Sequence, residues 1–192
     1  MRMRRTLRRL RREAGYTLIE MLTVLVIMGV VTGSLTTLFV QASNAESDMN
    51  NRFQAQLTAR LALDKMRREV HCASVGTPAG SSSSVTLTLP SYCKTGSGSI
   101  TWCTRNVSTN RYALYRVVGA TCTGGVMWAD YLSPSSTATA CSGALCIFSY
   151  TGQSSTSLAT LSVDFPVNVK PTKTVELYEL TDNIVLRNST RT

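Results

Sequence analysis

The sequence predicts an α+β fold, in which a long N-terminal α-helix packs on an antiparallel β-sheet. Three observations lead to this prediction. Residues 21–40 carry no charge, and the segment that follows keeps apolar residues at helical spacing. Beyond residue 84 the apolar residues alternate instead, which is typical of strands. All six cysteines follow residue 70, so a disulfide-stabilised domain is expected there.

The composition is that of a folded chain. Of its 192 residues, 43% are hydrophobic and 16% are charged, which excludes a disordered polymer and a membrane protein with many spans. The formal net charge is +9, but residues 1–15 hold seven arginines and one glutamate and so supply +6 of it. The rest of the chain is weakly basic, which gives little support to a dedicated nucleic-acid-binding protein.

The first half of the predicted helix is long enough to cross a membrane. Twenty uncharged residues, 21–40, rise by about 30 Å as an α-helix, which matches the hydrocarbon core of a bilayer. Arginine clusters resist translocation, so residues 1–15 are expected to stay in the cytoplasm. The chain after residue 40 would then be exported from a single span in the cytoplasmic membrane.

Glu20 and a glycine pair stand out in this apolar segment. A carboxylate inside a membrane helix costs about 2–3 kcal/mol, so Glu20 calls for a positively charged partner. The alternative is that Glu20 lies at headgroup depth, near a helix N-terminus. Gly29 and Gly33 form a G-x-x-x-G motif that lets two helices approach closely. The alternative is that they are two small residues without a packing role.

Residues 41–71 are predicted to continue the helix in amphipathic form and to end near His71. Because one apolar side of this helix needs a cover, we expect it to lie on the rest of the chain. The side predicted to be covered consists of Phe53, Leu57 and Leu61, continued by Ala62, Met66 and Val70.

The chain beyond residue 72 is predicted to form an antiparallel sheet. Residues 76–84 are expected to be a flexible break and residues 133–143 a surface loop, and Val126–Leu132 fits a short strand or a helical turn. The predicted strands are 85–89, 99–104, Arg111–Val118, 146–150, 158–169 with an interruption at Pro166, and 175–180, with 183–187 belonging to the last strand or following it.

Six cysteines on the exported side can form three disulfides in fifteen pairings. Spacing favours Cys141–Cys146 closing a loop and Cys93–Cys103 flanking a Gly/Ser turn, which leaves Cys72–Cys122; the connectivity stays open. A zinc site would use His71, Cys72, Cys141 and Cys146. Its spacing matches no common zinc pattern and an oxidising compartment disfavours thiols, so no metal is expected.

The sequence gives no signal of catalysis. His71 is the single histidine, which excludes a metal site with two histidines, and no glycine-rich phosphate loop opens a helix. We therefore expect no enzymatic activity, no catalytic residue and no cofactor. The acidic residues of the domain are interpreted as solvated faces, and they are Asp130, Asp164, Glu176, Glu179 and Asp182.

Residues 15–25 resemble the processing motif of type IV pilins and type II secretion pseudopilins. The match consists of a basic leader, Gly15, the hydrophobic Tyr16, Glu20 and an apolar helix; Tyr16 departs from the phenylalanine most common there. The resemblance implies that a prepilin peptidase cleaves between Gly15 and Tyr16 and N-methylates Tyr16 with S-adenosylmethionine. It also implies that Glu20 neutralises the N-terminus of an adjacent subunit.

The resemblance implies a domain organisation and a set of partners. Residues 1–15 would be the leader peptide, 16–40 the transmembrane and assembly helix, 41–71 its amphipathic continuation and 72–192 the exported cysteine-rich domain. The expected partners are the peptidase, other subunits, an inner-membrane assembly platform and lipid. The expected function is that of a structural subunit, a minor pilin or pseudopilin.

Two alternatives remain open. The first is a pilus component that captures DNA, using a patch next to aromatic residues; an ordinary surface is the favoured interpretation of these residues. The second is a secreted protein with a conventional signal peptide, because Val40-Gln41-Ala42 has small residues spaced as at a signal-peptidase site. The patch would consist of Arg105, Arg111, Arg116, Lys170 and Lys173 with Trp102 and Tyr115.

Overall fold

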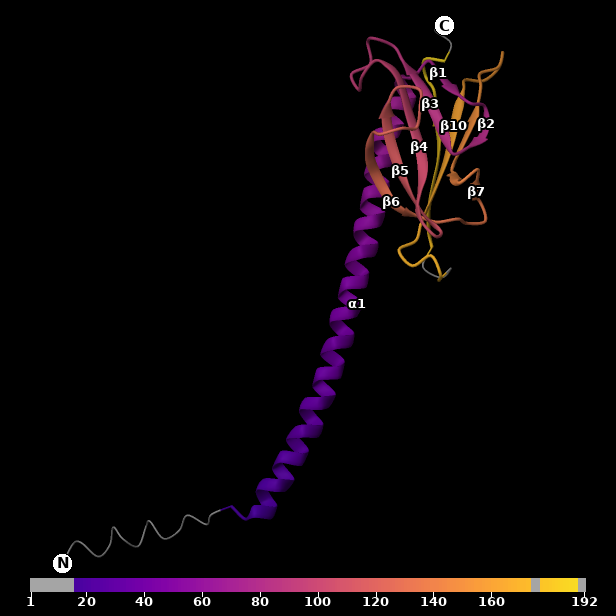
Figure 1. The fold of residues 1–192 in the computed structure, drawn as a ribbon. Coiled ribbons are helices and arrows are strands. Elements are labelled where there is room, and N and C mark those ends of the chain that lie inside the picture. Colours follow the sequence, from indigo (N-terminus) through magenta and orange to yellow (C-terminus); the bar gives the residue numbers. More distant parts are fainter. Residues whose placement is uncertain (1–15, 174–176, 190–192) are drawn as a thin grey trace, which may run out of the picture. The chain divides into compact units, whose positions relative to one another are not determined.

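A computed structural model describes residues 16–173 and 177–189 and confirms the predicted α+β fold (Figure 1). Helix α1 comprises Leu18–Cys72. The chain divides into two compact units, Met1–Asp48 and Met49–Thr192, so α1 contributes its first half to one and its second half to the other. Gly15 and the rest of the basic leader lie outside the described residues.

The second unit is built on antiparallel strands. Nine of them form one sheet in the order β1-β3-β4-β5-β6-β10-β9-β2, with β11 pairing with β10, and β7 and β8 form a separate hairpin. The strands are β1 Val75–Thr77, β2 Gly80–Ser82, β3 Ser84–Leu89, β4 Gly98–Ser108, β5 Arg111–Val118, β6 Val126–Leu132, β7 Thr139–Cys141, β8 Ala144–Cys146, β9 Phe148–Thr151, β10 Thr160–Val167 and β11 Tyr178–Val185.

The second half of α1 buries a different face from the one predicted. Phe53 and Leu61 are 60% and 53% exposed, so their assignment to the core was wrong, whereas Ala62, Met66 and Val70 are fully buried as predicted. The sheet supplies the bulk of the core through large side chains such as Trp102 and Phe165. Small alanines on the helix fit against such bulk better than a second layer of large residues would. The buried helix positions are Ala55, Ala59, Ala62, Leu63, Met66, Glu69 and Val70.

Most predicted strands are confirmed. β5 has the predicted bounds, the predictions for β3 and β4 lie within those strands, and the ambiguous segment Val126–Leu132 is strand β6. The two C-terminal segments form the single strand β11, while residues 174–176 lie outside the described residues. Pro166 stays inside β10 rather than interrupting it.

Three predictions about the loops were wrong, for a common reason. The expected break at 76–84 contains β1 and β2, the expected loop at 133–143 contains β7, and the predicted strand 146–150 is divided between β8 and β9. These strands have only three or four residues, and backbone pairing with another strand forms them: β2 pairs with the distant β9, and β7 pairs with its neighbour β8. The composition of such a short segment does not predict this pairing.

Three disulfides join the six cysteines. Cys141–Cys146 is confirmed, but Cys93–Cys103 and Cys72–Cys122 were wrong, because the structure pairs Cys72 with Cys93 and Cys103 with Cys122. The turn after β3 brings Cys93 back to the end of α1, and the loop after β5 folds back over β4. The zinc alternative loses its ligands, because its three cysteines are bonded in disulfides.

Glu69 is a fully buried charge that joins α1 to the sheet. Its carboxylate accepts hydrogen bonds from Trp102 Nε1 at 2.8 Å and Arg116 Nε at 2.9 Å, and Lys65 Nζ lies 3.3 Å away. A buried carboxylate is tolerated only when it is paired and hydrogen-bonded, and here both conditions are met. Glu69 therefore fixes the position of the helix on β4 and β5.

Candidate functional site

Thr17 caps the N-terminus of α1. The backbone N–H of Glu20 donates to the carbonyl of Thr17 at 3.0 Å and to its Oγ1 at 3.3 Å, and the N–H of Met21 donates to the same carbonyl. Thr17 and Glu20 occupy the N-cap and third positions of the helix, the spacing of a capping box. The negative charge of Glu20 also lies where the helix dipole favours it.

The carboxylate of Glu20 is left without a partner within the described part of the chain, and the residue is exposed. The neighbouring Tyr16 and Ile19 are 76% and 67% exposed. An acid is thus presented at the start of an apolar helix, and residues 16–173 and 177–189 provide no partner for its carboxylate, so a cation from another molecule can reach it. The sequence analysis predicted that Glu20 has a positively charged partner.

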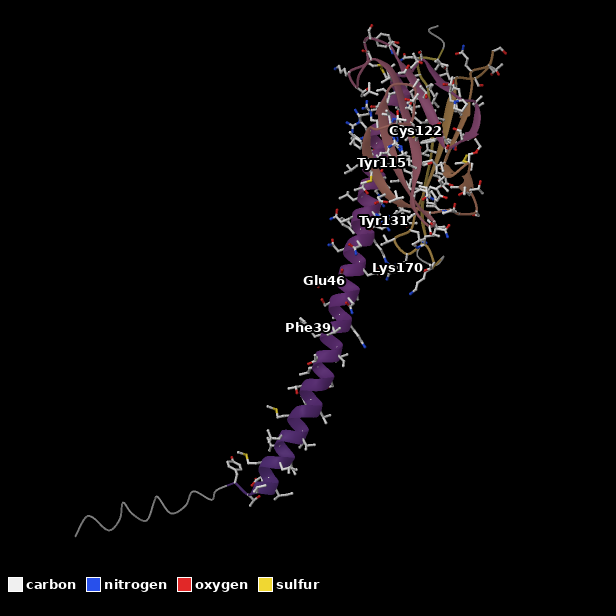
Figure 2. All side chains as sticks on the ribbon, in the orientation of Figure 1. Phe39, Glu46, Tyr115, Cys122, Tyr131 and Lys170 are labelled. Carbon is white, nitrogen blue, oxygen red and sulfur yellow. A yellow bond between two sulfur atoms is a disulfide. The ribbon has the colours of Figure 1, made fainter. Side chains whose placement is uncertain are left out.

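The apolar part of α1 meets the requirements for a membrane span. Among the described residues it is long and apolar enough to cross a bilayer, and none of the apolar window is buried within the chain. Phe39, labelled in Figure 2, is 77% exposed. The hydrophobic effect favours removing such a surface from water, so lipid or other helices are its natural surroundings.

Hydroxyl groups in this segment are already satisfied. Each donates to a backbone carbonyl three or four residues earlier, so none brings an unpaired donor into hydrocarbon. The bonds run from Thr23 to Glu20, Thr32 to Met28, Ser34 to Val31, Thr36 to Thr32 and Thr37 to Ser34, at 2.6–2.9 Å.

No contact within the described part of the chain requires a glycine at position 29 or 33. A Cβ added at either position would have no neighbour within 4 Å. Both glycines lower the intrinsic stability of the helix. A requirement for glycine here would therefore have to come from another molecule, as the helix-packing hypothesis supposes.

A second exposed apolar surface lies on the part of α1 that belongs to the domain. Met49, Phe53, Leu57 and Leu61 follow one another at intervals of four residues, and we call them the outer row. The core face of the same helix is covered by the sheet, so the outer row is the apolar side that remains available to a partner.

Two of the five basic residues in the proposed patch, Arg111 and Arg116, are neutralised by ion pairs. Arg111 forms a two-pronged ion pair with Asp130, with the shorter contact at 2.5 Å, and its Cζ lies 4.1 Å from the ring centroid of Tyr131. The hydrogen bond that Arg111 donates to Asp130 is the main cause that raises the pKa of Arg111. Arg116 binds the buried Glu69, so its charge is balanced as well.

The two aromatic residues of the proposed patch, Trp102 and Tyr115, are also unavailable for stacking on a nucleic-acid base. Trp102 is fully buried and cannot stack on a base, and Tyr115 is covered by Arg105, whose Cζ lies 4.2 Å from the ring centroid. Arg105 also donates to the carbonyl of Gly124 and to Cys122 Sγ, which fixes the loop between β5 and β6. Lys170 and Lys173 lie in the segment after β10, in which the N–H of Lys173 donates to the carbonyl of Lys170.

Three features were missed by the sequence analysis. The T-x-x-E spacing of Thr17 and Glu20 could have revealed the cap, since it is a known helix-start signature. The self-satisfied hydroxyls follow from placing Ser and Thr on a helix. The sequence gives no sign that Glu69 is buried. Lys65 lies four residues before it, and this spacing is equally typical of an ion pair on the exposed side of a helix.

The family model for the prokaryotic N-terminal methylation motif matches residues 10–36. The match confirms the prepilin-type motif predicted from the sequence, and it includes Gly15, Tyr16, Glu20, Gly29 and Gly33. No curated protein and no solved structure is significantly similar to the chain. The motif together with the exposed apolar helix agrees with anchoring in the inner membrane, and it implies processing by a prepilin peptidase.

Proposed function

We propose that this chain, a pilin-like protein with a prepilin-type N-terminal methylation motif, is a structural subunit of a type IV pilus or a type II secretion-like filament. The observation that carries the proposal is the carboxylate of Glu20, which lies just inside an exposed apolar helix with no partner in the described part of the chain. Such a group is costly in a membrane unless a cation meets it.

Processing creates that cation. A prepilin peptidase would cleave between Gly15 and Tyr16 and N-methylate Tyr16, which removes the leader's seven arginines and leaves one α-ammonium group at the start of the helix. A methylated amine keeps its charge. Glu20 of one subunit would pair with the N-terminus of its neighbour in an apolar environment, where the attraction between charges is stronger than in water.

The rest of the organisation follows from this assembly step. Residues 16–40 would hold the subunit in the membrane and then pack against other helices, residues 41–71 would carry the assembly helix into the domain, and residues 72–192 would be exported. The three disulfides suit an oxidising compartment. The inner-membrane assembly platform and neighbouring subunits are the partners, and the protein catalyses no reaction.

A minor subunit fits the domain better than a major one. A domain with three disulfides, a nine-stranded sheet and a separate hairpin is more elaborate than simple polymerisation requires. Quantifying the subunit in sheared filaments against the major pilin or pseudopilin tests this point, and a ratio near unity would contradict it.

DNA capture is the less favoured alternative. The ion pairs of Arg111 and Arg116 and the burial of Trp102 remove much of the charge and stacking surface that a single-stranded nucleic acid would use. A salt-dependent gel shift with the detergent-purified chain decides it. Binding that weakens steeply with salt would revive this alternative.

Intact-mass analysis of the protein extracted from membranes tests the processing step. We expect a chain that begins at Tyr16 and carries one N-methyl group. A chain that begins at Ser43 would instead support a conventional signal peptide, and an uncut chain in a host with an active prepilin peptidase would refute the proposal.

A further inference from the structure

Two carboxylates on the outward side of the sheet share one hydroxyl group. Asp164 lies opposite Thr181 and Glu179 opposite Pro166 in the ladder between β10 and β11, so the two acids are diagonal neighbours on one face. The alternate residues Val163 and Phe165 face the core. Thr137 Oγ1 donates to Asp164 Oδ2 and lies 3.5 Å from Glu179 Oε1. A hydroxyl has one proton, so it cannot satisfy two ionised carboxylates at once.

The second carboxylate oxygen of Asp164, Oδ1, is less well satisfied by hydrogen bonds than Oδ2. Asp164 Oδ1 is buried and accepts no hydrogen bond from the described residues. It belongs to the lining of a cavity of about 260 Å³, together with hydroxyl groups such as those of Ser149, Ser162 and Thr181. Burying an ionised carboxylate without full hydrogen bonding is unfavourable, and proximity to a second carboxylate adds to the cost.

Burial, the hydrogen bond from Thr137 and the nearby Glu179 all act on the protonation equilibrium of Asp164. Burial raises the pKa of Asp164, the hydrogen bond from Thr137 lowers it by less, and Glu179 raises it further. No other ionisable group faces Asp164 among the described residues: β9, β2 and the loop 133–147 contribute Tyr150 and disulfide-bonded cysteines, and Asp182 of β11 turns to Arg67 on the other side of the sheet.

Thr137 belongs to the loop between β6 and β9. The second half of this loop is held by the Cys141–Cys146 disulfide and by Thr104, which bonds both the N–H and the carbonyl of Leu145. The first half forms a turn in which Ser135 N–H donates to the carbonyl of Ala138. The hydroxyl of Thr137 makes the hydrogen bond that joins this turn to the acids of β10 and β11, and the next residue, Ala138, is buried in the core.

We propose that this turn, residues 134–138, is a pH-sensitive latch: it is docked firmly when Asp164 is protonated and loosens when Asp164 and Glu179 are both ionised. The sign follows from the direction of the shift. A carboxyl with a raised pKa in the folded state contributes stability that is complete below its unfolded pKa and is lost as pH rises through its folded pKa. Opening the turn would uncover the cavity beside Asp164, because Thr137 lines it.

Amide hydrogen exchange of the full chain in detergent micelles tests the latch at pH 4 and pH 7. The reporters are the amides of Ser135, Thr137 and Ala138, which are bonded within the turn. After correction for intrinsic exchange, we expect their protection to fall severalfold at pH 7 while amides of the β10–β11 ladder stay unchanged.

Variants separate the latch from general pH effects. Asp164→Asn imitates the protonated acid and should give high protection at both pH values, and Glu179→Gln should reduce the pH dependence without abolishing it. Thr137→Val should lower protection at both pH values, while the control Glu46→Gln on exposed α1 should behave like the wild type. An Asp164→Asn chain that shows the wild-type fall with pH, or a wild type without that fall, would overturn the proposal.

Discussion

Trp102 on β4 donates a hydrogen bond of 2.8 Å to Glu69 on α1, and neither side chain is exposed to solvent. The bond joins residues 33 positions apart in the sequence, and Arg116 completes the charge balance from β5. The second half of α1 is thereby fixed to the sheet in one register.

Replacing Glu69 by alanine is expected to lower the free energy of unfolding by about 3 kcal/mol or more, because it leaves Arg116 and Trp102 without their acceptor in a buried site. Denaturant unfolding in detergent measures the loss. The matched control is Asp64→Ala, which removes an exposed partner of Arg67 and should cost less than about 1 kcal/mol. Equal losses in the two variants would show that Glu69 has no special role.

Gly125 is required by its backbone and its surroundings. Its φ is +85°, and a Cβ there would lie 2.5 Å from the carbonyl oxygen of Arg116. Gly125→Ala should therefore destabilise the protein by about 1–3 kcal/mol. Gly152→Ala, where a Cβ meets nothing within 4 Å, should be near neutral in the same unfolding experiment.

The disulfide pattern can be read directly by peptide mapping under non-reducing conditions. We expect linked peptides for Cys72–Cys93, Cys103–Cys122 and Cys141–Cys146. Removing the pair Cys103 and Cys122 by serine substitution should cost about 3 kcal/mol, since a loop of 19 residues is no longer closed in the unfolded chain. The shorter loop closed by Cys141–Cys146 should cost less.

The outer row is expected to matter for assembly and not for folding. Phe53→Ser and Leu57→Ser should leave the midpoint of unfolding almost unchanged, because both side chains are already exposed. Met66→Ala, at a fully buried position of the same helix, should cost about 2–5 kcal/mol. A defect in filament incorporation in the first two variants, at normal stability, would identify the outer row as a contact surface. Normal incorporation would show that it stays exposed in the filament.

The comparison between sequence and structure separates local from non-local information. The apolar span, the methylation motif and strand β5 were predictable, since each is encoded in a run of neighbouring residues. The buried face of α1 was not, because both Phe53-Leu57-Leu61 and Ala55-Ala59-Ala62 fit the helical period. Which of them meets the sheet depends on side chains such as Trp102 and Phe165, which come from strands far along the chain.

The same distinction applies to the sites. The motif that contains Gly15, Tyr16 and Glu20 was predictable because it is contiguous, whereas the pairing of Cys72 with Cys93 depends on where the turn after β3 returns to the helix. The sequence analysis interpreted Asp164 as solvated and did not single out Glu69. Their environments are made by β4, β5 and the loop before β9, and those contacts exist only after the chain has folded.

The most direct test of the assembly account is Glu20→Ala, expressed with the native peptidase and assembly machinery. Because the carboxylate costs about 2–3 kcal/mol when unpaired in the membrane, pairing it is worth at least a tenfold change in an equilibrium. We predict that the variant is cleaved and methylated as the wild type, by intact mass, but is recovered in sheared filaments at less than about a tenth of the wild-type yield. Glu46→Ala, an exposed acid further along α1, should be recovered normally. Full recovery of the processed Glu20→Ala subunit in filaments would contradict the account.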